Sequence, residues 1–367
     1  MRAGRRKEQQ FRNRERILAA AQEEFAQVGY REAKINSIAS RAELTRGAIY
    51  SNFPSKRALG LTVAASALRV NRPPLSGAVS REDVVVSVAQ ARLARLPTGR
   101  HGDASRVEQL RSDLYAEIRQ DPDLRDACAA LLQLGAIIFA RALEGLDTDD
   151  PIDRAVRVAS AVLTVLHSAD SLSAAAPGFI DPFTVVATCK ALASTDFDDR
   201  WSPPHESIVP ATQTIDRAWE PMSAVTDLVT DAPVQWESDG IVAILGLRQA
   251  AGIEQALRAA PHGHRLFVVL VSDEPAERIP LARFVLCEAI DALRDSVPPT
   301  ALARLSLVLD PEAAIARSAG LRATTDDTHV AIEIKNGRMT RFSEGPAACH
   351  AIAIRQGATN PQHASAN

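Results

Sequence analysis

The chain has 367 residues and a net charge of −3, with 46% hydrophobic and only 4% aromatic residues. At roughly 100–200 residues per domain, this length allows two or three domains, whose cores must depend on Ala, Leu, Val and Ile. We expect a soluble cytoplasmic protein, because no apolar run approaches the roughly 18 residues of a membrane helix and no signal-type segment follows the N-terminus.

The first residues of the chain are strongly basic. Residues 1–60 contain thirteen Lys and Arg against six Glu, a net charge of +7, so the remaining residues carry −10. A basic end on an acidic body is typical of a protein that binds a polyanion with one part only. Residues 1–11 have no apolar periodicity and predict a flexible basic arm, which either follows DNA or is a solvated tail.

Three helices are predicted next. The first runs from about Arg12 to Val28 and ends at Gly29. The apolar spacing of INSIASRA, residues 35–42, predicts a short second helix, and Thr45 is placed to cap a third that reaches Phe53. Two short helices joined by a tight turn, the second beginning with a basic residue, indicate a helix-turn-helix; a plain helical hairpin is the alternative from spacing alone.

Four consecutive stretches then resemble the TetR/AcrR family of bacterial transcriptional repressors: RERILAAAQEEFAQVGY, INSIASRAE, LTRGAIYSNF and PSKRAL, within residues 14–61. The resemblance implies that Arg46 reads a base edge, for which guanine is the natural partner of a bidentate arginine. It implies phosphate contacts by Thr45, Tyr50 and Lys56, which set register without reading sequence. The full expected set of DNA contacts is Lys34, Thr45, Arg46, Gly47, Tyr50, Asn52 and Lys56.

The chain departs from the family pattern at two positions. Lys34 stands where the family usually has a hydroxyl residue, and a lysine can meet a phosphate but cannot cap the second helix. Glu43 stands where the family usually has glycine, so a turn with positive φ would be strained there. A fourth helix is expected from about Lys56 to Leu68, ended by Pro73 and Pro74.

Residues 75–194 predict an all-helical regulatory body. Apolar residues recur every three to four positions near 81–95, 103–119, 123–144, 152–172 and 182–193. The last two helices are apolar nearly all round, so we expect them to form half of a four-helix homodimer interface, as the resemblance also implies. A pocket for a small-molecule effector would lie inside this body, although ordinary core packing explains the same residues: Leu110, Leu114, Tyr115, Ile118, Leu131, Leu134, Ile138 and Phe139, with Cys128 and His167 as polar contacts.

Residues 195–222 are acidic, contain proline and have no period, which is typical of a linker. Beyond them, residues 223–356 predict an α/β domain, followed by a tail at 357–367. Strands at 241–247, 266–271, 305–309 and 329–334 alternate with helices, and Asn336-Gly337 turns the chain into a last strand at 339–342. Parallel strands closed by a hairpin predict an α/β sandwich, and the order of elements resembles a thioredoxin-like fold.

The chemistry of that fold is missing. The stretch RQAAGIEQAL after the first strand has no Cys, and Thr328 stands where the family has a cis-proline, so we expect a catalytically empty module for ligand or protein contact. The four cysteines are far apart, with no CxxC and no His at metal-ligand spacing. No catalytic residue, cofactor or metal site is expected.

The sequence therefore predicts a multidomain protein: an all-α TetR-like part followed by an α/β part. Its predicted function is a homodimeric repressor that binds a double-stranded DNA operator and is released by an unknown effector. A redox-responsive regulator or enzyme using Cys287 and Cys349 is the alternative, and an interaction module at the C-terminus is a third.

Overall fold

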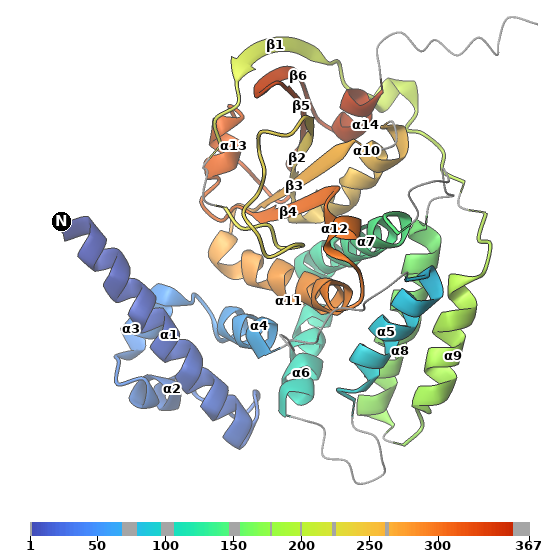
Figure 1. Cartoon of the computed structure of the whole chain (residues 1–367). Helices are drawn as coiled ribbons and strands as arrows, with labels where there is room; N and C mark the ends of the chain where they lie inside the picture. Colours follow the sequence, from blue (N-terminus) through green and yellow to red (C-terminus); the bar gives the residue numbers. More distant parts are fainter. Residues whose placement is uncertain are drawn as a thin grey trace, which may run out of the picture.

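The computed structural model describes residues 2–67, 79–96, 106–146, 155–176, 178–198, 200–221, 225–260 and 264–354. A small three-helix unit lies at one side, a bundle of longer helices lies beside it, and a six-stranded sheet covers the top of the bundle (Figure 1). The expected stop of the fourth helix near Pro73 and the tail at 357–367 lie outside these residues.

The small unit consists of α1 (Arg2–Val28), α2 (Ile35–Arg41) and α3 (Arg46–Asn52). Ile38 and Ile49 of the two short helices are almost fully buried against α1. Helix α1 begins at Arg2, so the prediction of a flexible arm over residues 1–11 is wrong for the part that the structure describes. The segment lacks an apolar stripe, but it is rich in Arg, Lys, Glu and Gln, which favour helix, and Arg12 pairs with Glu8 one turn away.

The helical body follows the predicted pattern. It consists of α4 (Lys56–Ala67), α5 (Arg81–Leu93), α6 (Arg106–Gln120), α7 (Pro122–Glu144), α8 (Val156–Ala175) and α9 (Pro182–Ala193). Helices α7 and α8 are long and apolar enough to cross a membrane by length and composition, which the sequence reading missed. In α7, however, 72% of the apolar window is buried inside the protein, as in the core helix of a soluble protein, against 39% in α8.

The sheet contains β1 (Gln213–Ala218), β2 (Gly240–Gly246), β3 (Arg265–Val271), β4 (Leu305–Leu309), β5 (His329–Lys335) and β6 (Arg338–Glu344). Its order is β1-β6-β5-β2-β3-β4, with β2, β3 and β4 parallel and the other neighbours antiparallel. The predicted parallel strands and the hairpin are confirmed; Asn336 and Gly337 have φ values of 50° and 70°.

Two expectations about this part are wrong. Strand β1 lies inside the predicted linker. The sequence did not indicate it, because an edge strand that is exposed along most of its length shows no apolar alternation. The α/β part is also not a separate domain. Helix α11 (Pro275–Arg294) lies between the sheet and the helical body (Figure 1). The buried side chains of both form one continuous core. Its relation to the thioredoxin-like fold stays a prediction.

Shorter helices complete the α/β part: η1 (Glu206–Ile208), η2 (Leu247–Gly252), α10 (Ile253–Ala259), α12 (Pro299–Leu302), α13 (Ala314–Ser318) and α14 (Ala348–Ala353). The other face of the sheet is covered by a second cluster that includes Trp219, Trp236 and Ile315 of α13. The parallel strands β2, β3 and β4 are therefore buried on both faces, as expected for parallel strands.

Candidate nucleic-acid interface

Helix α3 presents its first turn to solvent. Thr45 is its N-cap and accepts a hydrogen bond from the Ala48 amide at 3.2 Å, as the sequence predicts. Arg46 and Gly47 follow and are exposed. The Arg46 guanidinium lies over the Tyr50 ring, 5.4 Å from its centroid, and that ring is 40% exposed. An arginine and a tyrosine one turn apart thus share the outward face of α3.

The turn before α3 has the strained geometry that the sequence suggested. Glu43 has a φ of 49°, a conformation that glycine adopts without cost, and its carboxylate accepts a 2.8 Å hydrogen bond from Arg16. Lys34 occupies the N-cap position of α2 and makes no side-chain cap, which confirms the other departure. Its exposed ammonium can meet a phosphate.

Two expected DNA contacts point elsewhere. Lys56 Nζ donates to the carbonyl oxygens of Arg31 and Ala33, both at 3.0 Å, and lies 4.7 Å from the Tyr30 ring centroid. It therefore holds the loop between α1 and α2. Asn52 donates to the Ala48 carbonyl at 2.8 Å within α3. The resemblance fixes the positions of these residues but not their rotamers.

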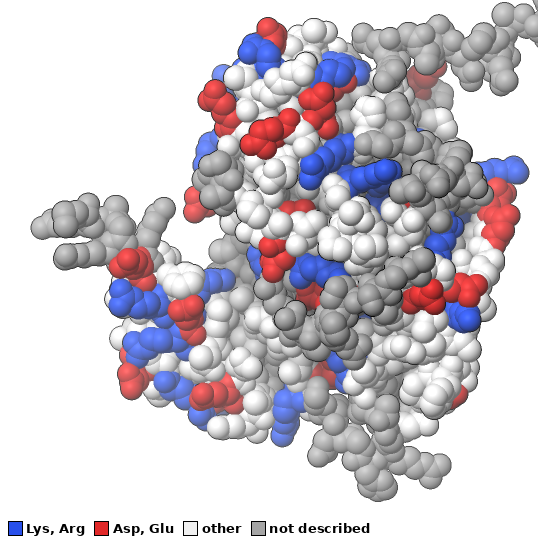
Figure 2. All heavy atoms as spheres, viewed as in Figure 1, with Lys and Arg blue, Asp and Glu red and all other residues white. Residues whose placement is uncertain are grey.

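The surface of this unit is basic with interspersed acids. Lys and Arg side chains gather over α1 to α3, and the blue atoms outnumber the red ones on the side that Figure 2 shows. Several of the arginines are paired: Arg31 with Asp113 at 2.7 Å and Arg41 with Glu24 at 2.9 Å. Arg46 makes no ion pair among the described residues, so its charge is available to a ligand.

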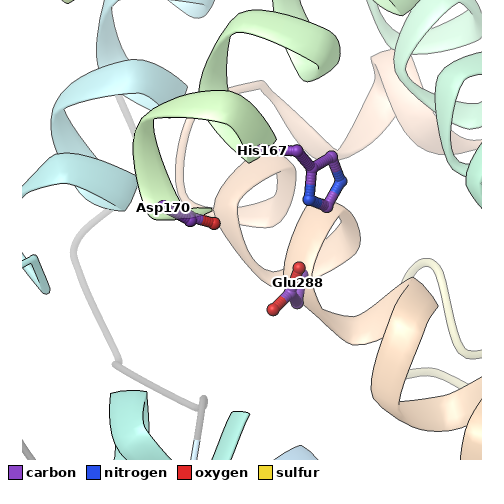
Figure 3. A group of neighbouring side chains, drawn as sticks. All are labelled: His167, Asp170 and Glu288. Carbon is purple, nitrogen blue, oxygen red and sulfur yellow. The ribbon is translucent and has the colours of Figure 1, made fainter. Parts of the chain in front are cut away.

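A buried ionic cluster lies deeper in the molecule and was missed by sequence reasoning. It consists of Arg92 of α5, Arg111 of α6, His167 and Asp170 of α8, and Glu288 of α11. Arg92 donates to Glu288 at 2.9 Å and to Asp170, and Arg111 contacts Glu288 as well. Figure 3 shows His167, Asp170 and Glu288 converging from two helices. Glu288 is 1% exposed, so this cluster joins four helices by fully desolvated charge.

The charges of the cluster are balanced. Burial lowers the pKa of His167 to about 3, and Arg92 adds to this, so the imidazole is neutral and its Nδ1 lies 3.1 Å from Arg92. Burial by itself would raise the pKa of Asp170, but attraction to Arg92 outweighs it and the pKa is lowered. Three potential metal-ligand atoms of His167, Asp170 and Glu288 lie within 4.8 Å of one another. Since two guanidinium groups already neutralise both carboxylates, the donor set fits an ion-pair network rather than a cation site.

The expected effector-pocket residues are packed around α11. Leu110, Leu114, Ile118, Leu131, Leu134, Ile138 and Phe139 are at most 3% exposed, and the Tyr115 ring lies 5.1 Å from that of Phe284 in α11. Only His167 of the expected set reaches an open groove of about 620 Å³ between α7 and α8, whose lining includes Gln133, Ser160 and Thr164.

The position expected for a redox site in the α/β part holds no reactive thiol. Cys287 and Cys349 are both buried, and burial raises the pKa of Cys349 to about 12. A thiol with so high a pKa is a poor nucleophile. The burial of both thiols gives no support to the redox alternative.

Comparison with known proteins identifies the first unit. Residues 17–62 match the family described as bacterial regulatory proteins, tetR family, which confirms the resemblance in residues 14–61. Among curated proteins, none matches the chain significantly.

Several solved structures are similar to this chain. A TetR transcriptional regulator from Rhodococcus sp. RHA1 is 16% identical, with a TM-score of 0.34, over 51% of this chain and 95% of that one. The multidrug binding protein EbrR, complexed with imidazole, is 20% identical, with a TM-score of 0.35, over 50% and 91%. The transcriptional regulator FadR from Bacillus subtilis, in complex with stearoyl-CoA, is 14% identical, with a TM-score of 0.30, over 48% and 96%. Scores this low do not establish a common arrangement, so the family match of residues 17–62 decides: the N-terminal domain of this chain belongs to the tetR family of bacterial regulatory proteins.

Proposed function

We propose that this chain is a homodimeric transcriptional repressor that binds a near-palindromic DNA operator. The observation that carries the proposal is the exposed first turn of α3 in a tetR-family domain, where Thr45 caps the helix and the exposed Arg46 makes no ion pair among the described residues. A recognition helix enters the major groove with its N-terminal residues at the base edges. Arg46 is then the residue that reads a base, with guanine as its partner.

Phosphate contacts come from the groups around that helix. Lys34, Thr45 and Tyr50 are exposed, as Arg46 is, and the Tyr50 ring lies beside the Arg46 guanidinium. These contacts fix the register on the duplex and make the affinity salt-dependent, while Arg46 supplies specificity. Lys56 is left out of this set, because its ammonium is held by the α1–α2 loop.

The dimer surface is the outer face of α8 and α9. Helix α9 is apolar, yet only Cys189 and Ala193 are buried in it, and Phe183 and Phe179 are 85% and 69% exposed. Helix α9 lies at the outer edge of the molecule (Figure 1). An apolar helix face of this kind needs a cover, and a second copy related by twofold symmetry also places two recognition helices on one DNA duplex. We expect Phe183→Glu to give a monomer in sedimentation velocity; an unchanged dimer contradicts this interface.

Release by a small-molecule effector completes the proposal. Such a ligand acts by binding one conformation of the dimer more tightly than the other. The Tyr115 ring packs against Phe284 of α11, so a ligand that displaces this ring alters the contact with α11.

The test uses the full chain and the DNA upstream of its own coding region. Fluorescence anisotropy is measured with this DNA and with random DNA of the same length, for the wild type and Arg46→Ala. We expect the wild type to prefer the upstream DNA and Arg46→Ala to lose about 1–3 kcal/mol of that preference, with little change on random DNA. No preference in the wild type, or equal losses on both DNAs, contradicts the proposal.

A further inference from the structure

The segment that joins the small three-helix unit to the helical body is bonded directly to α11 of the α/β part. Glu277, in the first turn of α11, accepts hydrogen bonds from the Ser55 hydroxyl at 2.7 and 2.9 Å. It also accepts from Arg57 Nε at 3.0 Å and pairs with Arg57 Nη2 at 2.9 Å. Arg57 extends the contact to Asp121, the N-cap of α7, at 3.2 Å. We call Ser55, Arg57, Asp121 and Glu277 the junction.

The junction sits at the point where the recognition helix leads into the rest of the protein. Ser55 accepts a hydrogen bond from the Ala58 amide at 2.9 Å, so its hydroxyl caps α4 while donating to Glu277. The Glu277 carboxylate thus lies at the N-terminus of α4, where the helix dipole favours negative charge. Only Phe53 and Pro54 separate Ser55 from the end of α3. Any displacement of Glu277 therefore acts near the C-terminal end of the recognition helix α3.

The same turn of α11 is tied to the sheet. Helix α11 begins after the carboxyl end of β3, and Arg278, the neighbour of Glu277, pairs with Asp326 in the segment before β5. Asp326 in turn packs its backbone against Gly246 at the end of β2. Ligands of open α/β sheets bind at the carboxyl ends of parallel strands. One turn of one helix thus connects this edge of the sheet to α3.

We propose that Glu277 is a positioning residue, through which the α/β part of the chain sets the orientation of the recognition helix. This inference rests on the proposed DNA-binding function. The carboxylate is 16% exposed in its side chain and receives charged and neutral donors together, so the contact is stronger than a surface ion pair. Without it, α4 and α3 sample more orientations, of which fewer fit two half-sites at once.

The test compares Glu277→Gln with Glu274→Gln in the full chain. Glu274 lies three residues before Glu277, and among the described residues its carboxylate pairs only with Arg278, at 3.5 Å. Glu274→Gln removes the same charge as Glu277→Gln. We expect Glu277→Gln to weaken binding to the upstream DNA at least threefold with less than twofold change on random DNA, and Glu274→Gln to match the wild type. Equal ratios in all three proteins overturn the inference.

Hydrogen exchange of the free protein gives a readout that does not depend on DNA. Glu277→Gln should speed amide exchange in α3 and the first turn of α4, with no change in β2 and β3, whereas Glu274→Gln leaves all of them unchanged. Uniformly faster exchange, or none, means that Glu277 acts only on global stability and overturns the inference. If Glu277→Gln speeds exchange in α3 and α4 as expected but the wild type does not prefer the upstream DNA, the proposed function is refuted and the inference about Glu277 stands.

A double-mutant cycle identifies the route. If Glu277 acts through Arg57, the variant Arg57→Ala combined with Glu277→Gln has the same ratio of specific to random affinity as Arg57→Ala. Additive losses overturn this route.

Discussion

The buried ionic cluster makes a quantitative prediction about Glu288. Its side chain is 1% exposed and faces Arg92 and Arg111, with the Tyr115 hydroxyl 3.4 Å away. Glu288→Ala leaves Arg92 with Asp170, and it leaves Arg111 with Asp170 and Glu108, both at 3.6 Å. Breaking a buried ion pair by removing one partner costs about 3–5 kcal/mol. Since whole domains are stable by about 5–15 kcal/mol, this is a large fraction of the total.

Urea denaturation followed by circular dichroism measures the effect. With an m-value of about 2 kcal/mol/M, the midpoint should fall by about 1.5–2.5 M relative to the wild type. Glu344→Ala is the matched control, because Glu344 is exposed and should change stability by less than about 0.5 kcal/mol.

The combination Arg111→Ala with Glu288→Ala tests the cause. Because each single variant removes a close partner of a buried charge, the double variant should be about 1–3 kcal/mol more stable than the sum of the single losses predicts. A loss below about 1 kcal/mol for Glu288→Ala, or strictly additive losses, refutes the view that desolvated charge holds α11 in the body.

Three further predictions follow from the same structure. Lys56→Met should lower the free energy of unfolding by about 1–3 kcal/mol, because it loses the hydrogen bonds to the Arg31 and Ala33 carbonyls. The salt dependence of DNA affinity should not change; if the slope of log affinity against log salt falls by about 1, Lys56 contacts a phosphate after all. The pKa of His167 is about 3 in the folded state against about 6.5 in the unfolded state, so the unfolded state takes up the proton first as the pH falls. The contribution of His167 to the free energy of unfolding should therefore be fully present above pH 6.5 and fall by about 1.4 kcal/mol per pH unit below it. His167→Gln should make the urea midpoint less dependent on pH between pH 7 and 5, and an equally steep fall in this variant contradicts the assignment. A chain ending at Ser194 lacks α11 and should elute as aggregate or show no cooperative unfolding, and a folded dimer of this length contradicts the shared core.

The DNA-binding unit was predictable because its signals are local. Thr45 caps α3 by accepting a hydrogen bond from the Ala48 amide, three residues ahead, and Glu43 has the positive φ that its place in the turn requires. Such features depend on a few neighbours in sequence, so a pattern of residue types identifies them. The start of α1 was not predicted, because its residues favour helix but form no apolar stripe, and the missing stripe was interpreted as absence of structure.

The packing of α11 was not predictable, because it joins segments more than 150 residues apart. Phe284 contacts Tyr115, and Glu288 pairs with Arg92 and Arg111, yet on separate helices these charges look like surface residues. One weak signal existed. Leu281, Phe284 and Glu288 share a helical stripe, which places a carboxylate on an otherwise apolar face and indicates a buried partner of opposite charge.

The shared core has a consequence for synthesis of the protein. Helices α4 to α7 leave the ribosome before α11, whose last residue, Arg294, follows the end of α7 at Glu144 by 150 residues. At roughly 5–20 residues per second, the faces that α11 covers stay open for about 7–30 s. During this time Arg92 and Arg111 have no Glu288 to neutralise them, which opposes premature closure of the body. Nascent chains should therefore need a chaperone until the sheet is translated, and two subunits should meet only afterwards.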